Sequence, residues 1–194
     1  MTDKKSIANK HFTLSDNFLQ LVENVLVENV KNQNIHMYMG PPRDDIREHY
    51  RQITKWSDFR ILVPTLFNFF HGIELLLKAA NYKANTPTDN PNHKLAKLFA
   101  DFKSNYPSAS TLTRIFQKYI HPSDADTNIL KAFYSANNVS DSSQFYEIFK
   151  YPFFKDFKTS FNYAGLRNLD NDGILFFTQI TMDIQTIRIE TEKL

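Results

Sequence analysis

Residues 64–82, which read PTLFNFFHGIELLLKAANY, decide the fold class. The stretch is apolar around most of its helical circumference, as a helix at the centre of a bundle must be. It therefore predicts a core helix, and the chain around it is expected to form an all-α helical bundle.

Upstream of the core helix, the apolar pattern predicts two further helices. Residues 12–30 place apolar side chains at the i, i+3, i+4 spacing of one buried face, with Ser15 or Asp16 as the expected N-cap. A more polar helix is expected over residues 43–56, after a break at Gly40. Its apolar face comprises Ile46, Tyr50 and Ile53.

Downstream, three shorter helices are expected on apolar stripes at residues 95–102, 112–120 and 129–133. Residues 145–163 are rich in aromatic side chains and are expected to be irregular. Residues 174–194 fit both a helical and a strand period, and their length favours a helix. The chain as a whole is expected to be one domain, 1–194, with residues 1–60 as an N-terminal helical extension packed on the bundle.

The composition excludes several classes of function. The chain has 194 residues, no Cys and four Gly, so disulfides, thiolate metal sites and the clustered glycines of Rossmann and P-loop proteins are excluded. Its formal charge of +2 predicts neither a large nucleic-acid surface nor a membrane surface. Residues 1–10 lack the apolar core of a signal peptide, and we expect a cytoplasmic protein.

Four polar side chains interrupt the core helix at i+3 and i+4 steps: Asn68, His71, Glu74 and Lys78. Residues at these steps are neighbours on one helix face, so the four form a polar seam. Burying a carboxylate and an ammonium is costly unless the two groups pair. The seam is therefore either a structural ion pair of Glu74 and Lys78 or the wall of a ligand-binding pocket.

The six histidines show no metal-binding pattern. No H-E-x-x-H or other His pair at ligand spacing is present, so neither a metal nor another cofactor is expected. His11 is isolated in the sequence. His93 precedes the next expected helix, where it could turn back toward the seam or bond the free amides of the helix end.

Three stretches resemble a known family. They are FFHGIELLLKA at residues 69–79, HKLAKL at 93–98 and YAGLRNLDND at 163–172. In these stretches the chain resembles the HEPN superfamily, most clearly over residues 64–99. The resemblance implies a bundle with two long antiparallel central helices, a homodimer, and a role in RNA metabolism, toxin–antitoxin pairs or phage defence.

HEPN ribonucleases carry an Arg followed, after four to six residues, by a His. The resemblance implies that the Arg holds phosphate while the His moves a proton during metal-independent attack by the ribose 2′-hydroxyl. Two pairs in this chain have the spacing, Arg114 with His121 and Arg43 with His49, and both precede the last expected helix. The usual late position is nearer Arg167, which no His follows.

Two hypotheses of function follow. In the first, the protein is HEPN-like and binds or acts on RNA or a nucleotide, in stress or phage defence, with a pocket formed by His71, Glu74, Lys78 and Arg167. Whether it is a metal-independent ribonuclease is left open. In the second, it is a non-catalytic helical module that binds a protein partner, and the seam stabilises the fold.

Overall fold

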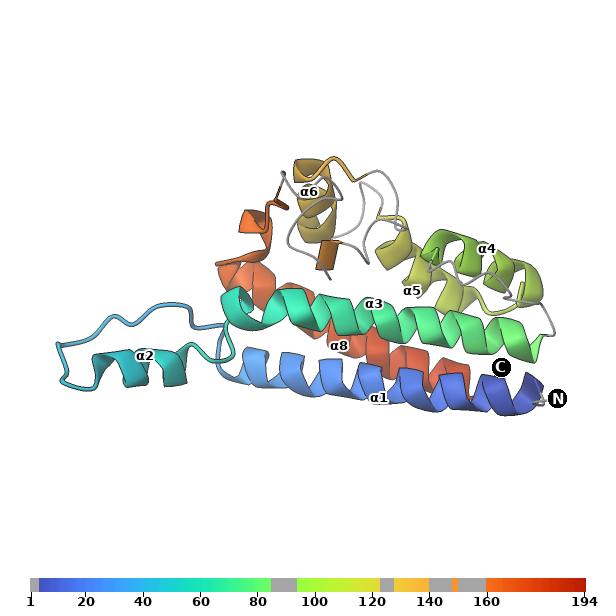
Figure 1. Ribbon diagram of the computed structural model, residues 1–194, viewed down its shortest axis with the longest axis horizontal. Helices are drawn as coiled ribbons and strands as arrows, with labels where there is room; N and C mark the ends of the chain where they lie inside the picture. Colours follow the sequence, from blue (N-terminus) through green and yellow to red (C-terminus); the bar gives the residue numbers. More distant parts are fainter. Residues whose placement is uncertain (1–3, 85–93, 123–127, 140–147, 150–159) are drawn as a thin grey trace.

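The computed structural model describes residues 4–84, 94–122, 128–139, 148–149 and 160–194 (Figure 1). These residues form an all-α bundle, which confirms the expected fold class. The elements are α1 (Lys4–Lys31), α2 (Ile46–Ile53), α3 (Asp58–Lys83), α4 (Leu95–Asn105), α5 (Ser110–Ile120), α6 (Asn128–Ala136), the 3₁₀ turn η2 (Ala164–Leu166) and α8 (Asp170–Thr191).

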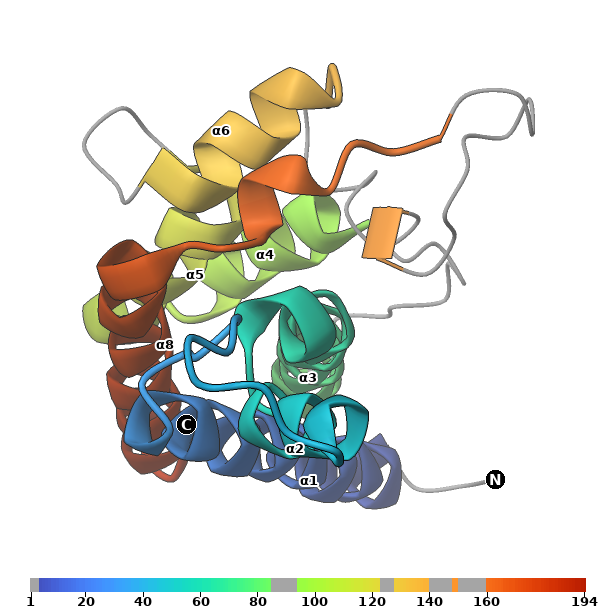
Figure 2. The ribbon, with the colours of Figure 1, turned by 90° about the vertical axis from the view of Figure 1, so that its left-hand side faces the viewer.

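Helix α3 is the centre of the bundle, as residues 64–82 predict. In the end-on view it lies between α1 and α8 on one side and α4, α5 and α6 on the other (Figure 2). Its side chains are buried in several directions, and Leu66, Phe70 and Leu77 are fully inaccessible. The helix begins at Asp58 rather than at Pro64, because buried Leu62 extends the apolar stripe upstream and a helix can accept the exposed proline at the loss of one backbone bond.

Helix α1 runs antiparallel to α3 along its whole length (Figure 1). The expected N-cap at Ser15 or Asp16 is wrong, because α1 begins at Lys4 and passes through both residues. Ser15 is instead buried at the crossing with α3, where its hydroxyl donates a 2.8 Å hydrogen bond to the carbonyl of Gly72. A Cβ atom at Gly72 would lie 3.0 Å from Leu19, so this glycine allows the close approach of the two helices.

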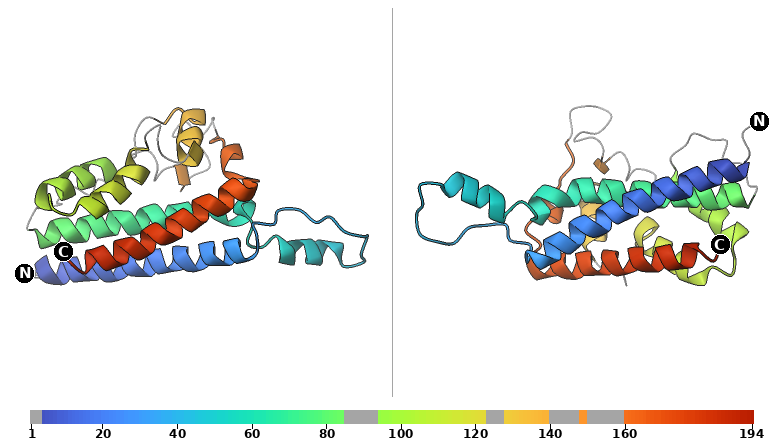
Figure 3. Two further views of the ribbon diagram at one scale, coloured as in Figure 1. Left: turned by 180° about the vertical axis from the view of Figure 1, so that it is seen from behind. Right: turned by 90° about the horizontal axis from the view of Figure 1, so that it is seen from below.

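Helix α8 lies beside α1 and antiparallel to it (Figure 3). The helical interpretation of residues 174–194 is therefore confirmed. One face of α8 enters the core through Phe177, Ile180 and Ile184. At the edge of this contact, Arg188 Nε donates a 2.8 Å hydrogen bond to Asp16 of α1.

Helices α4, α5 and α6 cover the other side of α3 and coincide with the three predicted stripes. The buried side chains of Phe99, Phe102 and Phe116 join this layer to the core. Most of the aromatic region 145–163 lies outside the described residues, so its expected irregularity stays a prediction.

The end of α1, the start of α3 and the start of α8 meet at the buried carboxylate of Asp58. The backbone amides of Asn168 and Leu169 donate to it at 3.0 and 2.6 Å, and Asn34 Nδ2 donates at 3.0 Å. In return, the Asp58 amide donates to Asn34 Oδ1 at 2.7 Å. After the last residue of α1, Gln33 and Asn34 adopt a left-handed backbone (φ 55° and 49°), which asparagine tolerates better than most residues and which turns the chain away from the path of α1.

Residues 35–56, which we call the arm, leave the bundle after Asn34 and return before Ser57. Both views show the arm and its helix α2 extending beyond the end of the bundle (Figures 1 and 3). No residue of α2 is buried. Helix α2 therefore adds surface to the protein without contributing to its core, whereas the returning end of the arm is anchored by buried Thr54.

One described stretch, Ile46–Lys83, contains an 18-residue window whose length and mean hydropathy would suit a membrane span. Of this window 61% is buried inside the protein, and the core helix of a folded bundle passes the same test. This feature alone is weak support for membrane insertion.

Candidate functional site

The seam of α3 forms a compact polar group at three of its four positions, Glu74, Lys78 and His71. Glu74 is fully inaccessible, its Oε1 accepts a hydrogen bond from Lys78 Nζ, and His71 Nδ1 lies 3.7 Å from its Oε2. Asn68 is turned away from this group, since its amide donates to the carbonyl of Pro64 at 2.9 Å. The Glu74–Lys78 ion pair that the spacing suggests is present.

His11 and Tyr82 extend the seam across to α1. Their rings are stacked, with centroids 5.7 Å apart and planes 6° from parallel. His71 lies against Phe18 of α1, edge to face at 4.6 Å. Sequence analysis missed His11 because its partners come from another helix, so its isolation in the sequence says nothing about its surroundings in the fold.

Electrostatics tune His11 toward its neutral form. Burial lowers the pKa of His11 below its ordinary value of 6.5, the positive charge of Lys78 lowers the pKa further, and Glu74 partly opposes both effects. Because the folded pKa lies below the unfolded value, the unfolded state binds the proton more tightly. The contribution of His11 to stability is therefore retained above about pH 6.5 and declines as the pH falls below it.

We expect an NMR titration of the His11 ring to give a pKa below 6.5, and Lys78→Met to raise it. The rise follows from removing a positive charge near the imidazole while keeping an apolar side chain of similar length. Lys83→Met is the matched control, since Lys83 is an exposed lysine on the same helix. A pKa at or above 6.5 in the wild type, or one unmoved by Lys78→Met, would contradict the arrangement of the seam.

Arg114 and His121 are not held together by the structure. Arg114 is exposed on α5, whereas His121 follows the last residue of that helix with an extended backbone (φ −133°, ψ 72°). The two therefore do not share a helix face as their spacing suggests, because a residue before proline, here Pro122, disfavours the helical conformation. The ring of His121 lies 6.3 Å from that of Phe99.

Arg43 and His49 lie on the arm, and each has its own neighbour. Arg43 Nε and its terminal nitrogen donate to the two oxygens of Asp45 at 2.8 and 3.1 Å. This pairing raises the pKa of Arg43 and lowers that of Asp45, and it occupies the fork that a phosphate would need. The ring of His49 packs edge to face on Tyr38 at 4.8 Å.

The remaining candidates of the pocket are not brought to the seam. The Arg167 guanidinium lies 4.9 Å from the ring centre of Phe59, in the first turn of α3. Fifteen residues separate Phe59 from Glu74, which is about 22 Å along the helix. His93 lies outside the described residues.

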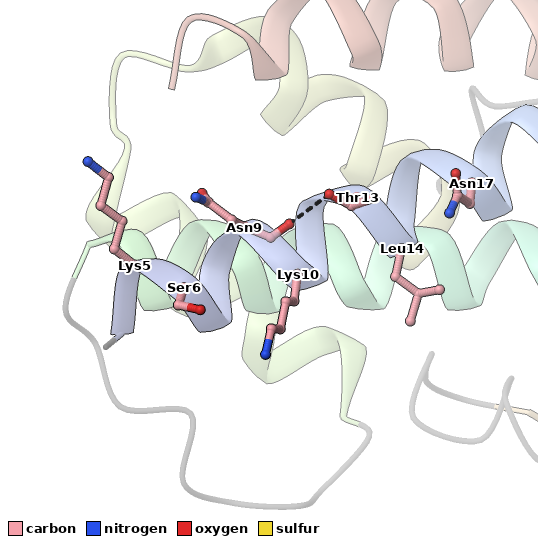
Figure 4. A pocket seen from close by; sticks show the side chains of 7 residues that line it. All are labelled: Lys5, Ser6, Asn9, Lys10, Thr13, Leu14 and Asn17. Carbon is pink, nitrogen blue, oxygen red and sulfur yellow. Dashed lines mark hydrogen bonds between the residues drawn. The ribbon is translucent and has the colours of Figure 1, made fainter. Parts of the chain in front are cut away.

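Two hollows at the surface do not include the seam. The larger, of about 680 Å³, is lined by seven residues that all belong to α1, so other elements do not close it around a ligand (Figure 4). A second, of about 520 Å³, lies where α1 and α8 meet the end of α3. Within the described part of the chain, no three His, Cys, Asp or Glu side chains are grouped as a metal site would require.

A second buried polar group joins α5 to α8. Asp183 accepts hydrogen bonds from Tyr119 Oη and from Gln179 Nε2, the latter at 3.1 Å, and it pairs with Lys118. The carboxylate is thus enclosed by three donors of its own chain. The sequence gives no sign of this group, because Tyr119 and Asp183 are 64 positions apart.

Comparison of the chain with protein-family models, with curated proteins and with solved structures finds no match.

Proposed function

We propose that the protein is a non-catalytic helical module that binds a protein partner through its arm. The observation that carries this proposal is α2, an amphipathic helix with no buried residue. A helix of this length is marginal in water unless its apolar face is covered. A partner that covers this face would stabilise the arm and be bound by it.

The side chains of the arm suit an interface. Among the described residues, the arm carries more exposed large hydrophobic side chains than any of the helices of the bundle: Ile35, Met37, Met39, Ile46 and Tyr50. Met39 is 88% exposed. Methionine adapts to irregular apolar surfaces, and tyrosine is among the residues that contribute most to binding energy.

Two hydrogen bonds within the arm support its own conformation before binding. Tyr50 Oη donates to the carbonyl of His36 at 3.2 Å, and Tyr38 Oη donates to that of Pro41 at 3.1 Å. Such order reduces the entropy lost on association. Arg47 makes no ion pair with any residue that the structure describes, so an apolar groove with carboxylates at its rim is the expected partner surface.

The seam also supports a non-catalytic role, because its charges are poorly suited to bind a phosphate. The charges of Glu74 and Lys78 neutralise each other, and His11 is tuned toward neutrality, so the group offers little net charge to a phosphate. The two Arg and His pairs lack a shared catalytic geometry. An RNA-linked role stays a prediction from the family resemblance.

We expect Met39→Glu to weaken partner binding at least tenfold and to leave the melting temperature unchanged. A charge at this exposed position would have to be desolvated in an apolar interface. The partner would be captured with tagged wild-type protein from the cells that make it, purified, and titrated by calorimetry. Leu21→Glu, at an exposed leucine of α1, is the matched control.

Two results would overturn the proposal. One is a captured protein that binds wild type and Met39→Glu equally well. The other is cleavage of single-stranded RNA by the pure protein in EDTA that His121→Ala or His49→Ala abolishes, because such cleavage would establish a metal-independent ribonuclease.

A further inference from the structure

Two arginines lie at the first turn of α3 without a carboxylate partner. Arg60 belongs to that helix, whereas Arg167 belongs to the short segment between η2 and α8. Both residues are exposed, and neither forms an ion pair with any residue that the structure describes. Arg188, by contrast, pairs with Asp16 and Glu23. The two arginines therefore carry uncompensated positive charge at the end of the bundle from which the arm extends (Figure 1).

Aromatic rings position both guanidinium groups. The guanidinium carbon of Arg167 lies 4.9 Å from the ring centre of Phe59, and that of Arg60 lies 6.0 Å from the ring centre of Tyr50. Arg60 is held further by buried Thr54, whose hydroxyl accepts a 3.1 Å hydrogen bond from its Nε. A guanidinium on the face of a ring keeps its terminal nitrogens available for a planar acceptor that takes two hydrogen bonds. A carboxylate is such an acceptor.

The carboxylates nearest in sequence to these arginines are engaged elsewhere. Asp58 is buried and accepts hydrogen bonds from Asn34 and from two backbone amides. Asp170 Oδ1 lies 3.5 Å from His36 Nδ1. The missing counter-charge for the arginines can therefore come from an anion of another molecule.

We propose that Arg60 and Arg167 bind the carboxylates of an acidic segment in the protein that the arm recognises. This inference rests on the proposed function, because it extends the partner surface from the arm to the start of α3. Tyr50 connects the two parts of that surface. Its ring lies beside Arg60, and its hydroxyl donates a 3.2 Å hydrogen bond to the carbonyl of His36 on the outgoing half of the arm.

Three features favour a protein over a nucleic acid as the occupant. One face of Phe59 and one face of Tyr50 are already covered by a guanidinium, which leaves these rings less able to stack on bases. The adjoining arm carries Asp44, Asp45 and Glu48, which would repel a continuous phosphate backbone. A protein with separate carboxylates avoids this repulsion, and it also supplies apolar side chains to cover the exposed apolar residues of the arm.

Trp56 provides a probe of this site, because it is the only tryptophan of the chain and lies four positions before Arg60. The intact protein would be titrated with hexaglutamate, blocked at both ends, at about 50 mM NaCl while the emission of Trp56 is recorded. We expect a saturable change, and an affinity that falls about fivefold at about 500 mM NaCl because salt screens exposed charges. Hexaglutamine should cause no such change.

The double variant Arg60→Gln/Arg167→Gln should bind hexaglutamate about tenfold more weakly and keep the wild-type melting temperature, because both positions are exposed. Arg114→Gln, at an exposed arginine of α5, is the matched control and should bind like wild type. Hexaglutamate that leaves the emission of wild type unchanged would overturn the proposal, as would equal binding to the double variant. Hexauridylate that binds more tightly than hexaglutamate, and that the double variant no longer binds, would also overturn it, since the occupant would then be a nucleic acid.

A further comparison separates this inference from the proposed function. Met39→Glu should bind hexaglutamate like wild type, although it weakens binding of the captured partner. A captured partner that binds Arg60→Gln/Arg167→Gln as tightly as wild type, but Met39→Glu more weakly, would overturn this inference and leave the proposed function intact.

Discussion

Replacing Asp58 by alanine is expected to lower the free energy of unfolding by about 3–4 kcal/mol. The carboxylate is 1% exposed and accepts hydrogen bonds from Asn34, Asn168 and Leu169. The substitution leaves these three donors unmatched at about 1–3 kcal/mol each, and the lower end of that sum applies because the bonds from the Asn168 and Leu169 amides are only partly buried. For a chain of this length the loss corresponds to a fall of about 10 °C in melting temperature.

Thermal unfolding followed by circular dichroism would measure this effect. Asp45→Ala is the matched control, because Asp45 is an exposed carboxylate and its pairing with Arg43 at the surface is expected to contribute little to stability. Asp58→Asn keeps one acceptor oxygen and should fall between the two. If Asp58→Ala and Asp45→Ala have the same melting temperature, the end of α1 and the starts of α3 and α8 are not held together through Asp58.

Replacing Lys78 by alanine is expected to lower the free energy of unfolding by about 3 kcal/mol. Glu74 is fully buried, and removing the ammonium leaves its charge in the protein interior without the neutralising partner on the next turn. Breaking a buried ion pair from one side is typically much more harmful than removing the pair as a whole. Urea unfolding with constant m-value would measure the change.

The double variant Glu74→Leu/Lys78→Met separates a structural seam from a ligand site. We expect it to recover most of the stability that Lys78→Ala loses, because apolar side chains of similar size replace both charges. Lys83→Ala, at an exposed lysine of the same helix, should be nearly neutral. A Lys78→Ala variant as stable as wild type would contradict the structural interpretation of the seam.

The helices that pack into the core could be predicted from the sequence, because burial of one helix face places apolar residues at a regular helical spacing. The stripes of residues 64–82, 95–102 and 112–120 correspond to α3, α4 and α5. The two misplaced helix starts share a cause. Ser15 and Pro64 are residue types that usually mark the start of a helix. Contacts with neighbouring helices instead determine where α1 and α3 begin.

The polar groups could be predicted only where their members are near in sequence. Glu74 and Lys78 are four residues apart on one helix, so the spacing predicts their pairing. Asp58 meets amides 110 and 111 positions away, and Tyr119 meets Asp183 across 64. Helical spacing carries no information about residues so far apart in the sequence. Only the tertiary fold brings them together.

The paired hydrogen bonds between Asn34 and Asp58, which we call the clasp, allow the arm to change independently of the bundle. Two hydrogen bonds tie together the residues at which the chain leaves the bundle and returns to it. The outer residues of the arm, 37–53, can therefore be lengthened, shortened or exchanged while α1 and α3 keep their relative positions. Evolution could therefore change what the arm recognises without rebuilding the core, and the same clasp offers an engineer a fixed place at which to graft another binding loop.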